Sequence, residues 1–343
     1  MSQASIPHLV RTAAEPRQNR LYNVRLSHVE QANPSVRLLQ LAIPPQSVEE
    51  PESEGEIEPD HPQPFTFLPG QWLDVYIPSI SHAGGFSITS TPADAQILPS
   101  PQPRTESLAI VEEEEPGLSP VNPQGRAPYV ELAVQSAPGN PASAWLWKPA
   151  TEIQGKELTI RVGGSFVWPP SGIVLEEVRN VVLVAGGMGI NPLISILSHL
   201  NNNADEITAL HHPFNIHCLY STKSPEASTL DHILFLSRLR HIIRCQSHSQ
   251  SHRLRVSLDL FLTSLREYKS SSLLREPPAD LTIHPRRISR SDLQMAVAGP
   301  DGKVNPQNTV CYVCGPPSMT DELGSVLGEL VGQKERVFFE KWW

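Results

Sequence analysis

The sequence predicts two domains, an N-terminal antiparallel β-barrel followed by an α/β domain built on a parallel sheet. With 343 residues, the chain is long for a single domain. Up to about residue 170, short apolar or alternating segments are separated by proline, glycine and polar residues, which is typical of an all-β sandwich or barrel. From residue 173 onward, strand-like and helix-like segments alternate, which indicates a parallel sheet with covering helices. We place the boundary near residues 169–173.

The N-terminal half contains five strand-like segments, at residues 22–29, 36–43, 72–77, 129–135 and 158–162. Acidic, proline-rich segments near residues 44–64 and 99–128 are interpreted as insertions in solvated loops. Residues 1–20 are interpreted as a disordered tail or, alternatively, a short targeting sequence. The barrel domain is therefore expected over residues 21–170.

The C-terminal half, residues 173–343, contains three strand–helix pairs. The expected strands are residues 181–185, 215–220 and 310–313, and the helices that follow lie near residues 192–200, 230–239 and 319–330. A polar, serine-rich insertion is expected near residues 245–308, with helix-like segments at 261–268 and 292–298.

Composition excludes several classes of protein. The formal net charge of −9 argues against nucleic-acid binding. The sequence has no apolar run of about 18 residues, so we expect no transmembrane segment. The 4 cysteines, Cys218, Cys245, Cys311 and Cys314, suggest a reducing, intracellular compartment, cytoplasmic or mitochondrial.

Three glycines separate the first expected strand of the α/β domain from its helix. The segment reads Gly186-Gly187-Met188-Gly189-Ile190-Asn191-Pro192. Glycine lets the backbone approach a ligand closely, and the N–H groups and dipole of a first helical turn attract phosphate. A proline suits that turn, where its missing N–H leaves no bond unmade. We therefore expect a nucleotide pyrophosphate near residues 186–191, with a purely structural turn as the alternative.

Three further segments matter in combination with this turn. They are Gly84-Gly85-Phe86-Ser87-Ile88-Thr89-Ser90, Pro138-Gly139-Asn140-Pro141-Ala142-Ser143-Ala144-Trp145-Leu146 and Cys311-Tyr312-Val313-Cys314-Gly315-Pro316-Pro317-Ser318-Met319. In this order, the four segments resemble the ferredoxin–NADP reductase superfamily, and within it the oxidoreductase NAD-binding domain-containing proteins. The resemblance runs from about residue 22 onward, outside the insertions. It implies an FAD-binding barrel of the ferredoxin-reductase type and a Rossmann-like NAD(P)-binding domain.

In the barrel, the resemblance assigns flavin contacts to two short segments. Phe86 would cover one face of the isoalloxazine and Ser87 would hydrogen-bond near flavin N5, with Ile88 and Thr89 continuing the segment. Gly84 stands where the family has an arginine that pairs with the flavin pyrophosphate. Taken by themselves, these residues also fit a barrel strand with a β-bulge.

The second barrel segment is implied to bind the flavin pyrophosphate through Gly139, Ala142 and Ser143. It is a glycine turn that leads into a short helix, and such a turn can bind an anion. Backbone N–H groups near Ala142 and Ser143 would partly replace the missing arginine. An ordinary capped helix is the alternative.

In the α/β domain, the resemblance places Cys314, Gly315, Pro316 and Met319 beside the nicotinamide and flavin. A redox or zinc Cys-x-x-Cys pair is the rival interpretation. Because side chains alternate along a strand, Cys311 and Cys314 should face opposite sides of the sheet, which argues against such a pair. Cys311 is therefore expected to pack in the core.

The last residues include three further candidates. Related reductases cover the flavin with a terminal aromatic residue, and here Trp342 or Trp343 would do so. Both tryptophans alternatively pack the domain interface. Glu340 would orient the nicotinamide or a proton.

The choice of nicotinamide nucleotide is expected to depend on the end of the second strand. Selectivity for NADP requires a cation near the ribose phosphate, and Lys223 is the cation available there. Both NADH and NADPH remain candidates.

Together these features predict an FAD-dependent NAD(P)H oxidoreductase that passes a hydride from nicotinamide to flavin N5. The acceptor of the electrons is a small molecule or a separate redox protein, since the chain lacks the plant-type spacing for an iron–sulfur centre. No compact histidine spacing suggests a metal site. The alternative is a degenerate reductase fold that acts as a nucleotide-binding or interaction module, because Gly84, Phe86 and Met188 depart from the family pattern. A dehydrogenase without flavin is a third class, disfavoured by the barrel motifs.

Overall fold

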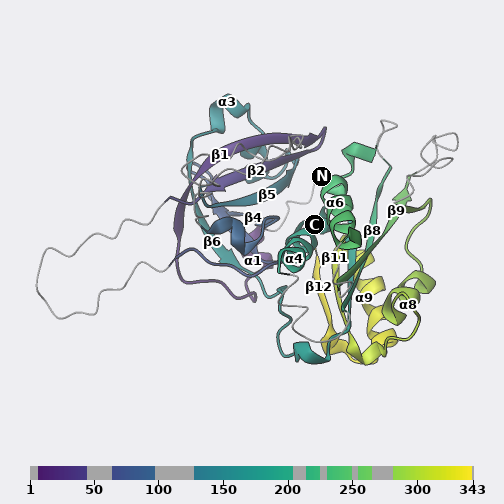
Figure 1. Ribbon diagram of the computed structural model, residues 1–343. Helices are drawn as coiled ribbons and strands as arrows, with labels where there is room; N and C mark the ends of the chain where they lie inside the picture. Colours follow the sequence, from purple (N-terminus) through teal and green to yellow (C-terminus); the bar gives the residue numbers. More distant parts are fainter. Residues whose placement is uncertain are drawn as a thin grey trace, which may run out of the picture.

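The computed structural model describes residues 7–44, 64–96, 127–203, 214–224, 230–248, 254–264 and 281–341. The chain forms an N-terminal domain around an antiparallel sheet and a C-terminal α/β domain around a parallel sheet (Figure 1). Both the fold class and the order of the two domains agree with the sequence-based prediction.

The first domain is a six-stranded sheet in the order β4-β3-β6-β1-β2-β5, with antiparallel neighbours throughout. A bridge between Ile88 and Leu132 links the two outer strands, which closes the sheet into a barrel. Alternate residues, among them Leu73, Val75 and Ile160, fill its interior. The strands are β1 (Tyr22–Asn33), β2 (Val36–Ala42), β3 (Trp72–Tyr76), β4 (Gly84–Ser87), β5 (Tyr129–Gln135) and β6 (Glu157–Gly163).

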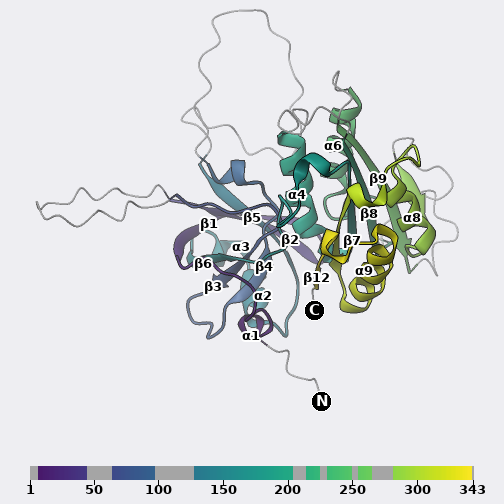
Figure 2. The same cartoon turned by 90° about the horizontal axis from the view of Figure 1, so that it is seen from below.

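Short helices flank the strands of the barrel. Helix α2 (Pro141–Leu146) follows β5, and α3 (Ala150–Ile153) precedes β6. A single helical turn, α1 (His8–Arg11), comes from the N-terminal segment. Both α1 and α2 contact β4, and Figure 2 shows them on the same side of the barrel.

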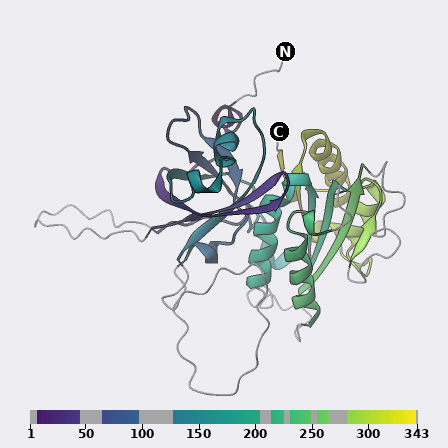
Figure 3. The same ribbon diagram turned by 90° about the horizontal axis from the view of Figure 1, so that it is seen from above.

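The second domain is a six-stranded parallel sheet in the order β10-β9-β8-β7-β11-β12. Helices α4 (Ile190–Asn202) and α6 (Leu236–His248) cover the face toward the barrel, and α8 (Arg290–Ala298) and α9 (Pro317–Val331) cover the other face (Figure 3). The strands are β7 (Asn180–Gly186), β8 (Phe214–Lys223), β9 (Leu254–Thr263), β10 (Thr282–His284), β11 (Thr309–Gly315) and β12 (Val337–Lys341).

In this domain one predicted helix is wrong and one strand was not predicted. The helix expected at residues 261–268 is wrong over its first part, because residues up to Thr263 belong to β9, whose apolar alternation packs against β8; residues 265–268 lie outside the described residues. Strand β12 was not predicted at all, and it pairs in parallel with β11. The segment expected as an insertion, residues 245–308, thus supplies two strands and a helix to the domain.

The interpretation of residues 1–20 as a disordered tail is wrong for the part that the structure describes. Residues 7–20 lie against the barrel, where Arg17 Nε is 2.9 Å from the carboxylate of Asp74. Asp74 is fully buried in β3, and burying a carboxylate is costly unless cations accompany it. The N-terminal segment is ordered because it supplies them. The two proline-rich insertions fall almost entirely outside the described residues.

Polar contacts join the two domains. The Asn191 side chain donates to the carbonyl oxygen of Ala133 at 3.0 Å, and the Ser195 hydroxyl donates to that of Ser90 at 2.6 Å. The helices of the described ranges include none with the length and apolar character needed to cross a membrane.

Candidate functional site

The glycine turn lies where β7 ends and α4 begins. Gly189 sits so close to the end of β11 that a Cβ atom there would overlap the carbonyl oxygen of Cys314. Gly187 adopts a φ of 54°, a conformation that favours glycine, and faces open space. The turn is therefore packed tightly on one side and accessible to a ligand on the other.

The remaining residues of the turn are mostly part of the interior. Ile190 packs in the core between α4 and the sheet, and Met188 packs at its edge. The Asn191 amide nitrogen is used in the contact with the barrel, while its Oδ1 atom is buried without a hydrogen-bond partner in the described part of the chain. Pro192 is buried in the first turn of α4. The backbone of the turn, rather than its side chains, is thus what a nucleotide would meet.

The end of β11 lies directly beside this turn. Met319 Sδ and Pro316 Cδ would lie 2.5 and 2.9 Å from a Cβ atom at Gly186, and Gly315 approaches the same residue. Two of the predicted segments therefore meet here, through Gly186 on one side and Gly315, Pro316 and Met319 on the other. Cys314 is fully buried against the barrel-side core.

Cys311 packs in the core on the opposite face of the sheet from Cys314. Burial raises the pKa of the Cys311 thiol well above its ordinary value. The predicted alternation is confirmed, and the two thiols do not form a pair.

Lys223 is the exposed last residue of β8. Gly186 on β7 pairs with Ser221 on β8, so Lys223 lies two residues beyond the level of the glycine turn. Because the carboxyl ends of parallel strands meet at one edge of the sheet, Lys223, Gly186 and Gly315 share that edge.

The barrel strand β4 leaves no room for the family's arginine. A Cβ atom at Gly84 would lie 2.6 Å from both Ala142 Cβ and Phe86 Cε2. The Phe86 ring is half-buried and packs against the barrel core. A longer side chain at position 84 would have to displace α2 or this ring.

Helix α2 is capped by its own side chains. The Oδ1 atom of Asn140 accepts hydrogen bonds from the backbone N–H groups of Ala142 and Ser143, at 3.1 and 3.2 Å. The Ser143 hydroxyl donates to the carbonyl oxygen of Gln135 at 2.7 Å. Gly139 faces open space. An anion would therefore have to compete with Asn140 for these two N–H groups.

The residues after Phe86 differ in their surroundings. Ser87 is buried, and its hydroxyl has no hydrogen-bond partner among the described residues. Its pairing with Trp72 puts both side chains on one side of the sheet. Ile88 lies in the barrel core, and the Thr89 hydroxyl donates to the Glu131 carboxylate at 2.7 Å.

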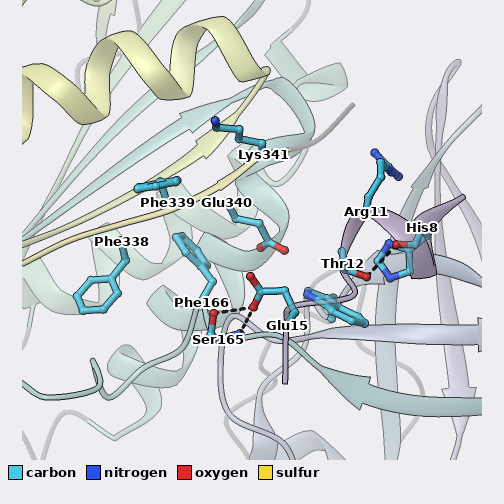
Figure 4. A pocket seen from close by; sticks show the side chains of 11 residues that line it. His8, Arg11, Thr12, Glu15, Ser165, Phe166, Phe338, Phe339, Glu340 and Lys341 are labelled. Atoms are coloured by element: carbon cyan, nitrogen blue, oxygen red, sulfur yellow. Dashed lines mark hydrogen bonds between the residues drawn. The ribbon is translucent and has the colours of Figure 1, made fainter. Parts of the chain in front are cut away.

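A cavity of about 310 Å³ opens between the N-terminal segment and β12 (Figure 4). Glu340 and Phe338 line it from the α/β domain, whereas Trp72 lines it from the barrel. Trp342 and Trp343 lie outside the described residues. The complete lining is His8, Arg11, Thr12, Glu15, Trp72, Ser165, Phe166, Phe338, Phe339, Glu340 and Lys341.

Glu340 is the most perturbed acid in this cavity. Its Oε2 atom is buried without a hydrogen-bond partner in the described ranges. Burial and, to a smaller extent, the charge of Glu15 together raise the pKa of Glu340 to about 8. Figure 4 shows the two carboxyl groups turned toward each other. The Glu340 carboxyl is therefore mostly protonated at neutral pH and can donate a hydrogen bond.

Sequence reasoning missed the charged residues that surround the cavity. Asp74 accepts hydrogen bonds from Arg17 and Arg161, at 2.9 and 2.8 Å, and His8 Nε2 lies 3.1 Å away. Burial acts to raise the pKa of Asp74, but these three partners outweigh it and hold the pKa below its ordinary value. An aspartate inside the otherwise apolar segment 72–77 was the signal that could have indicated such a network.

The residues present fit a flavin ring better than they fit its pyrophosphate. The unpartnered Ser87 hydroxyl, the neighbouring Trp72 and the cavity beside β12 suit a flat aromatic ring with polar edges. At the other end, Gly84 has no charge and the α2 N–H groups are already bonded. Within the described residues, no cluster of three or more His, Cys, Asp or Glu is arranged to hold a metal ion.

Comparisons with known proteins agree with this geometry. The model of the ferric reductase NAD binding domain matches residues 178–327. Oxidoreductase NAD-binding domain-containing protein 1 of Danio rerio is 29% identical over 343 residues, which cover 100% of this chain and 99% of that protein.

Two solved structures are similar in fold. The ferredoxin NADP+ reductase of Neisseria gonorrhoeae, with bound FAD and NADP, has a TM-score of 0.54 at 14% identity and covers 94% of this chain and 99% of its own. The CS-b5R domains of human Ncb5or, in the NAD+ form, have a TM-score of 0.57 at 16% identity, covering 93% of this chain and 69% of theirs. At these identities the similarity shows the fold alone.

Proposed function

Because this chain belongs to the ferredoxin reductase-like FAD/NAD-binding superfamily, we propose that it is an FAD-dependent NAD(P)H oxidoreductase. When bound, the flavin supplies a ring that takes a hydride from the nicotinamide at N5 and gives electrons to an acceptor. The acceptor is a small molecule or a separate redox protein.

The observation that carries this proposal is the meeting of two half-sites at the domain boundary. On one side is the glycine turn, with Gly187 open to a ligand; on the other is the Trp72 and Ser87 side of the barrel. Trp72 of the barrel and β12 of the α/β domain line one cavity, and β12 pairs with β11, whose end lies beside the glycine turn. A fold that holds two flat rings against each other needs binding elements on both domains.

In this proposal, each element has a distinct task. The backbone from Gly186 to Pro192 binds the nicotinamide nucleotide's pyrophosphate, and Lys223 lies near its ribose. Ser87 donates a hydrogen bond at the ring, and Glu340 presents a proton to the carboxamide or to the ring edge. Cys314 packs behind the ring, and Trp342 or Trp343 covers it. The two domains together exclude water from the ring pair.

The test is the visible spectrum of the purified protein, supplied with FAD, before and after anaerobic NADH or NADPH. Flavin bands that bleach with either nucleotide are expected. Gly187→Val should prevent the bleaching, whereas Gly302→Val should not, because both glycines have positive φ values and open surroundings but only Gly187 lies in the site. Protein that stays colourless with added FAD would contradict the proposal.

One observation favours a second function, a nucleotide-binding or interaction module without redox activity. The packing at Gly84 and the capping by Asn140 occupy the place of the flavin pyrophosphate contacts. This function predicts that NADH raises the melting temperature of the protein while FAD has no effect on it. The same pair of glycine variants separates specific from nonspecific binding.

A further inference from the structure

Arg11 differs from three other half-buried arginines of the barrel and its surroundings. Arg17, Arg161 and Arg238 each meet a carboxylate. The guanidinium of Arg11 has no acceptor among the described residues, and its Nε atom is buried. Burial lowers the pKa of Arg11. A buried donor of a charged group that lacks an acceptor is destabilising, so the retention of Arg11 points to an anion that binds there.

The position of Arg11 favours a ligand in the cavity between the N-terminal segment and β12. Figure 4 shows it on the barrel side of that cavity, away from Glu15. The other charged groups there already have partners. Lys341 Nζ is 2.7 Å from Asp321, and Glu15 accepts hydrogen bonds from the Ser165 N–H and hydroxyl, at 3.1 and 2.6 Å.

The remaining acid does not repel an anion strongly. Glu340 faces the same cavity, but burial keeps its carboxyl largely protonated at neutral pH. His8 is held by Asp74 at 3.1 Å. Within the described lining, Arg11 is thus the cation left to pair with an incoming ligand.

Gly85 of β4 explains why Arg11 reaches this place. A Cβ atom at Gly85 would overlap the imidazole of His8, so only glycine allows α1 to lie on the strand. The His8 ring also packs edge-on against Trp72, with ring centroids 4.7 Å apart. Arg11 follows His8 by three residues, one turn further along α1. Gly85 therefore has a structural use, because it lets the segment that carries Arg11 pack against β4.

We propose that Arg11 binds a phosphate of the dinucleotide in this cavity, where the N-terminal segment supplies a cation that β4 does not. This inference rests on the proposed function for the identity of the ligand. It adds the cavity-lining residues of the N-terminal segment, His8 to Glu15, to the binding site. The pyrophosphate of FAD and that of NAD(P)H share the same chemistry, and the experiment separates them.

Binding is measured by titrating the flavin-free protein with FAD, FMN and riboflavin, and flavin fluorescence is the signal recorded. Arg11→Gln should weaken FAD and FMN by about tenfold to a hundredfold and leave riboflavin, which has no phosphate, unchanged. The matched control Arg20→Gln removes the same charge from the same segment outside the cavity and should change none of the three. Equal affinities of wild type and Arg11→Gln for every ligand would overturn the inference.

Two further measurements keep the outcomes distinct. The first is a titration of both proteins with NADPH. If Arg11→Gln weakens the binding of NADPH alone, Arg11 contacts a phosphate of the nicotinamide nucleotide rather than of FAD. If the wild type binds neither FAD nor NAD(P)H, the proposed function fails, and inorganic pyrophosphate becomes the probe. Stabilisation by pyrophosphate that Arg11→Gln abolishes would then support the anion site, and stabilisation that persists would overturn it. Arg11→Gln itself should fold, with an unchanged or higher melting temperature, because an unpaired cation is removed.

Discussion

The Nη2 atom of Arg238 on α6 lies 3.0 and 3.2 Å from the two carboxylate oxygens of Glu131 on β5. The Nη1 atom of the same arginine donates to the backbone oxygen of Thr89 at 3.3 Å. Glu131 is buried. This pair thus ties a helix of the α/β domain to the end of β4 and to β5, next to the segments proposed to bind flavin.

Arg238→Met should destabilise the protein by about 2 kcal/mol, because Glu131 is left as a buried carboxylate with the Thr89 hydroxyl as its remaining side-chain partner. This expected loss of stability is smaller than for a fully buried ion pair, because Arg238 is itself partly exposed. The measurement is urea unfolding. The double variant Arg238→Met/Glu131→Gln should recover part of the loss, since the unpaired charge is gone. Equal losses in both variants would contradict a role for the charge.

Gly189→Ala should cost more than about 2 kcal/mol of stability and abolish NADH binding, since the added methyl group overlaps the Cys314 carbonyl. Gly324→Ala is the control. Gly324 lies inside α9 with open space around it, and alanine there should stabilise the protein by roughly 0.5–1 kcal/mol. Thermal unfolding and NADH titration report both effects. Similar behaviour of the two variants would rule out the close approach.

Lys223→Glu should weaken NADPH by at least about tenfold and change NADH binding much less, because the carboxylate would repel the ribose phosphate. Lys303→Glu makes the same charge change on an exposed loop and should affect neither nucleotide. The two affinities are measured by calorimetric titration. Equal weakening of both nucleotides would remove Lys223 from the site.

Glu340→Gln should make the stability of the ligand-free protein less dependent on pH. The folded-state pKa of Glu340 is raised from 4.5 to about 8, so the folded protein keeps a proton that the unfolded chain releases. Stability therefore falls as pH rises from about 4.5 to about 8, and the glutamine variant avoids this loss. Its melting temperature should equal that of the wild type at pH 4 and exceed it by about 5 °C at pH 9. Parallel curves would contradict the assignment.

Asp74→Asn should release the N-terminal segment. The substitution removes the buried carboxylate that pairs with Arg17 and Arg161. The free energy of unfolding should fall by about 3 kcal/mol at pH 7. Because the pKa of Asp74 is lowered, this contribution is present at neutral pH and disappears as pH falls through that lowered pKa.

Tryptic cleavage after Arg11 or Arg17 should accelerate about tenfold in this variant. The control is Glu157→Gln, which breaks the exposed ion pair with Arg25 and should change stability by less than about 0.5 kcal/mol. Resistance of the aspartate variant to trypsin would show that other contacts hold the segment.

Local patterns in the sequence were enough for most of the fold. The alternation of residues 129–135 and the apolar run at 181–185 match β5 and β7, since side-chain periodicity reflects a strand's own geometry. The opposite orientation of Cys311 and Cys314 followed from the same rule. The glycine turn was recognisable because its positive φ at Gly187 is a local requirement.

The charged residues of the site were decided by tertiary structure. Nothing near Glu131 indicates Arg238, which lies 107 residues away, and nothing near Asp74 indicates Arg17. The raised pKa of Glu340 depends on burial against a segment from the other end of the chain.

The sequence by itself therefore determined the two domains, most of their strands and the glycine turn, because each depends on neighbouring residues. Only the tertiary structure decided that part of the N-terminal segment, His8 to Glu15, lines a cavity and that Arg11 has no counter-ion there among the described residues. The physical reason is that burial and charge pairing depend on which distant segments come into contact, and the local sequence pattern does not specify those contacts.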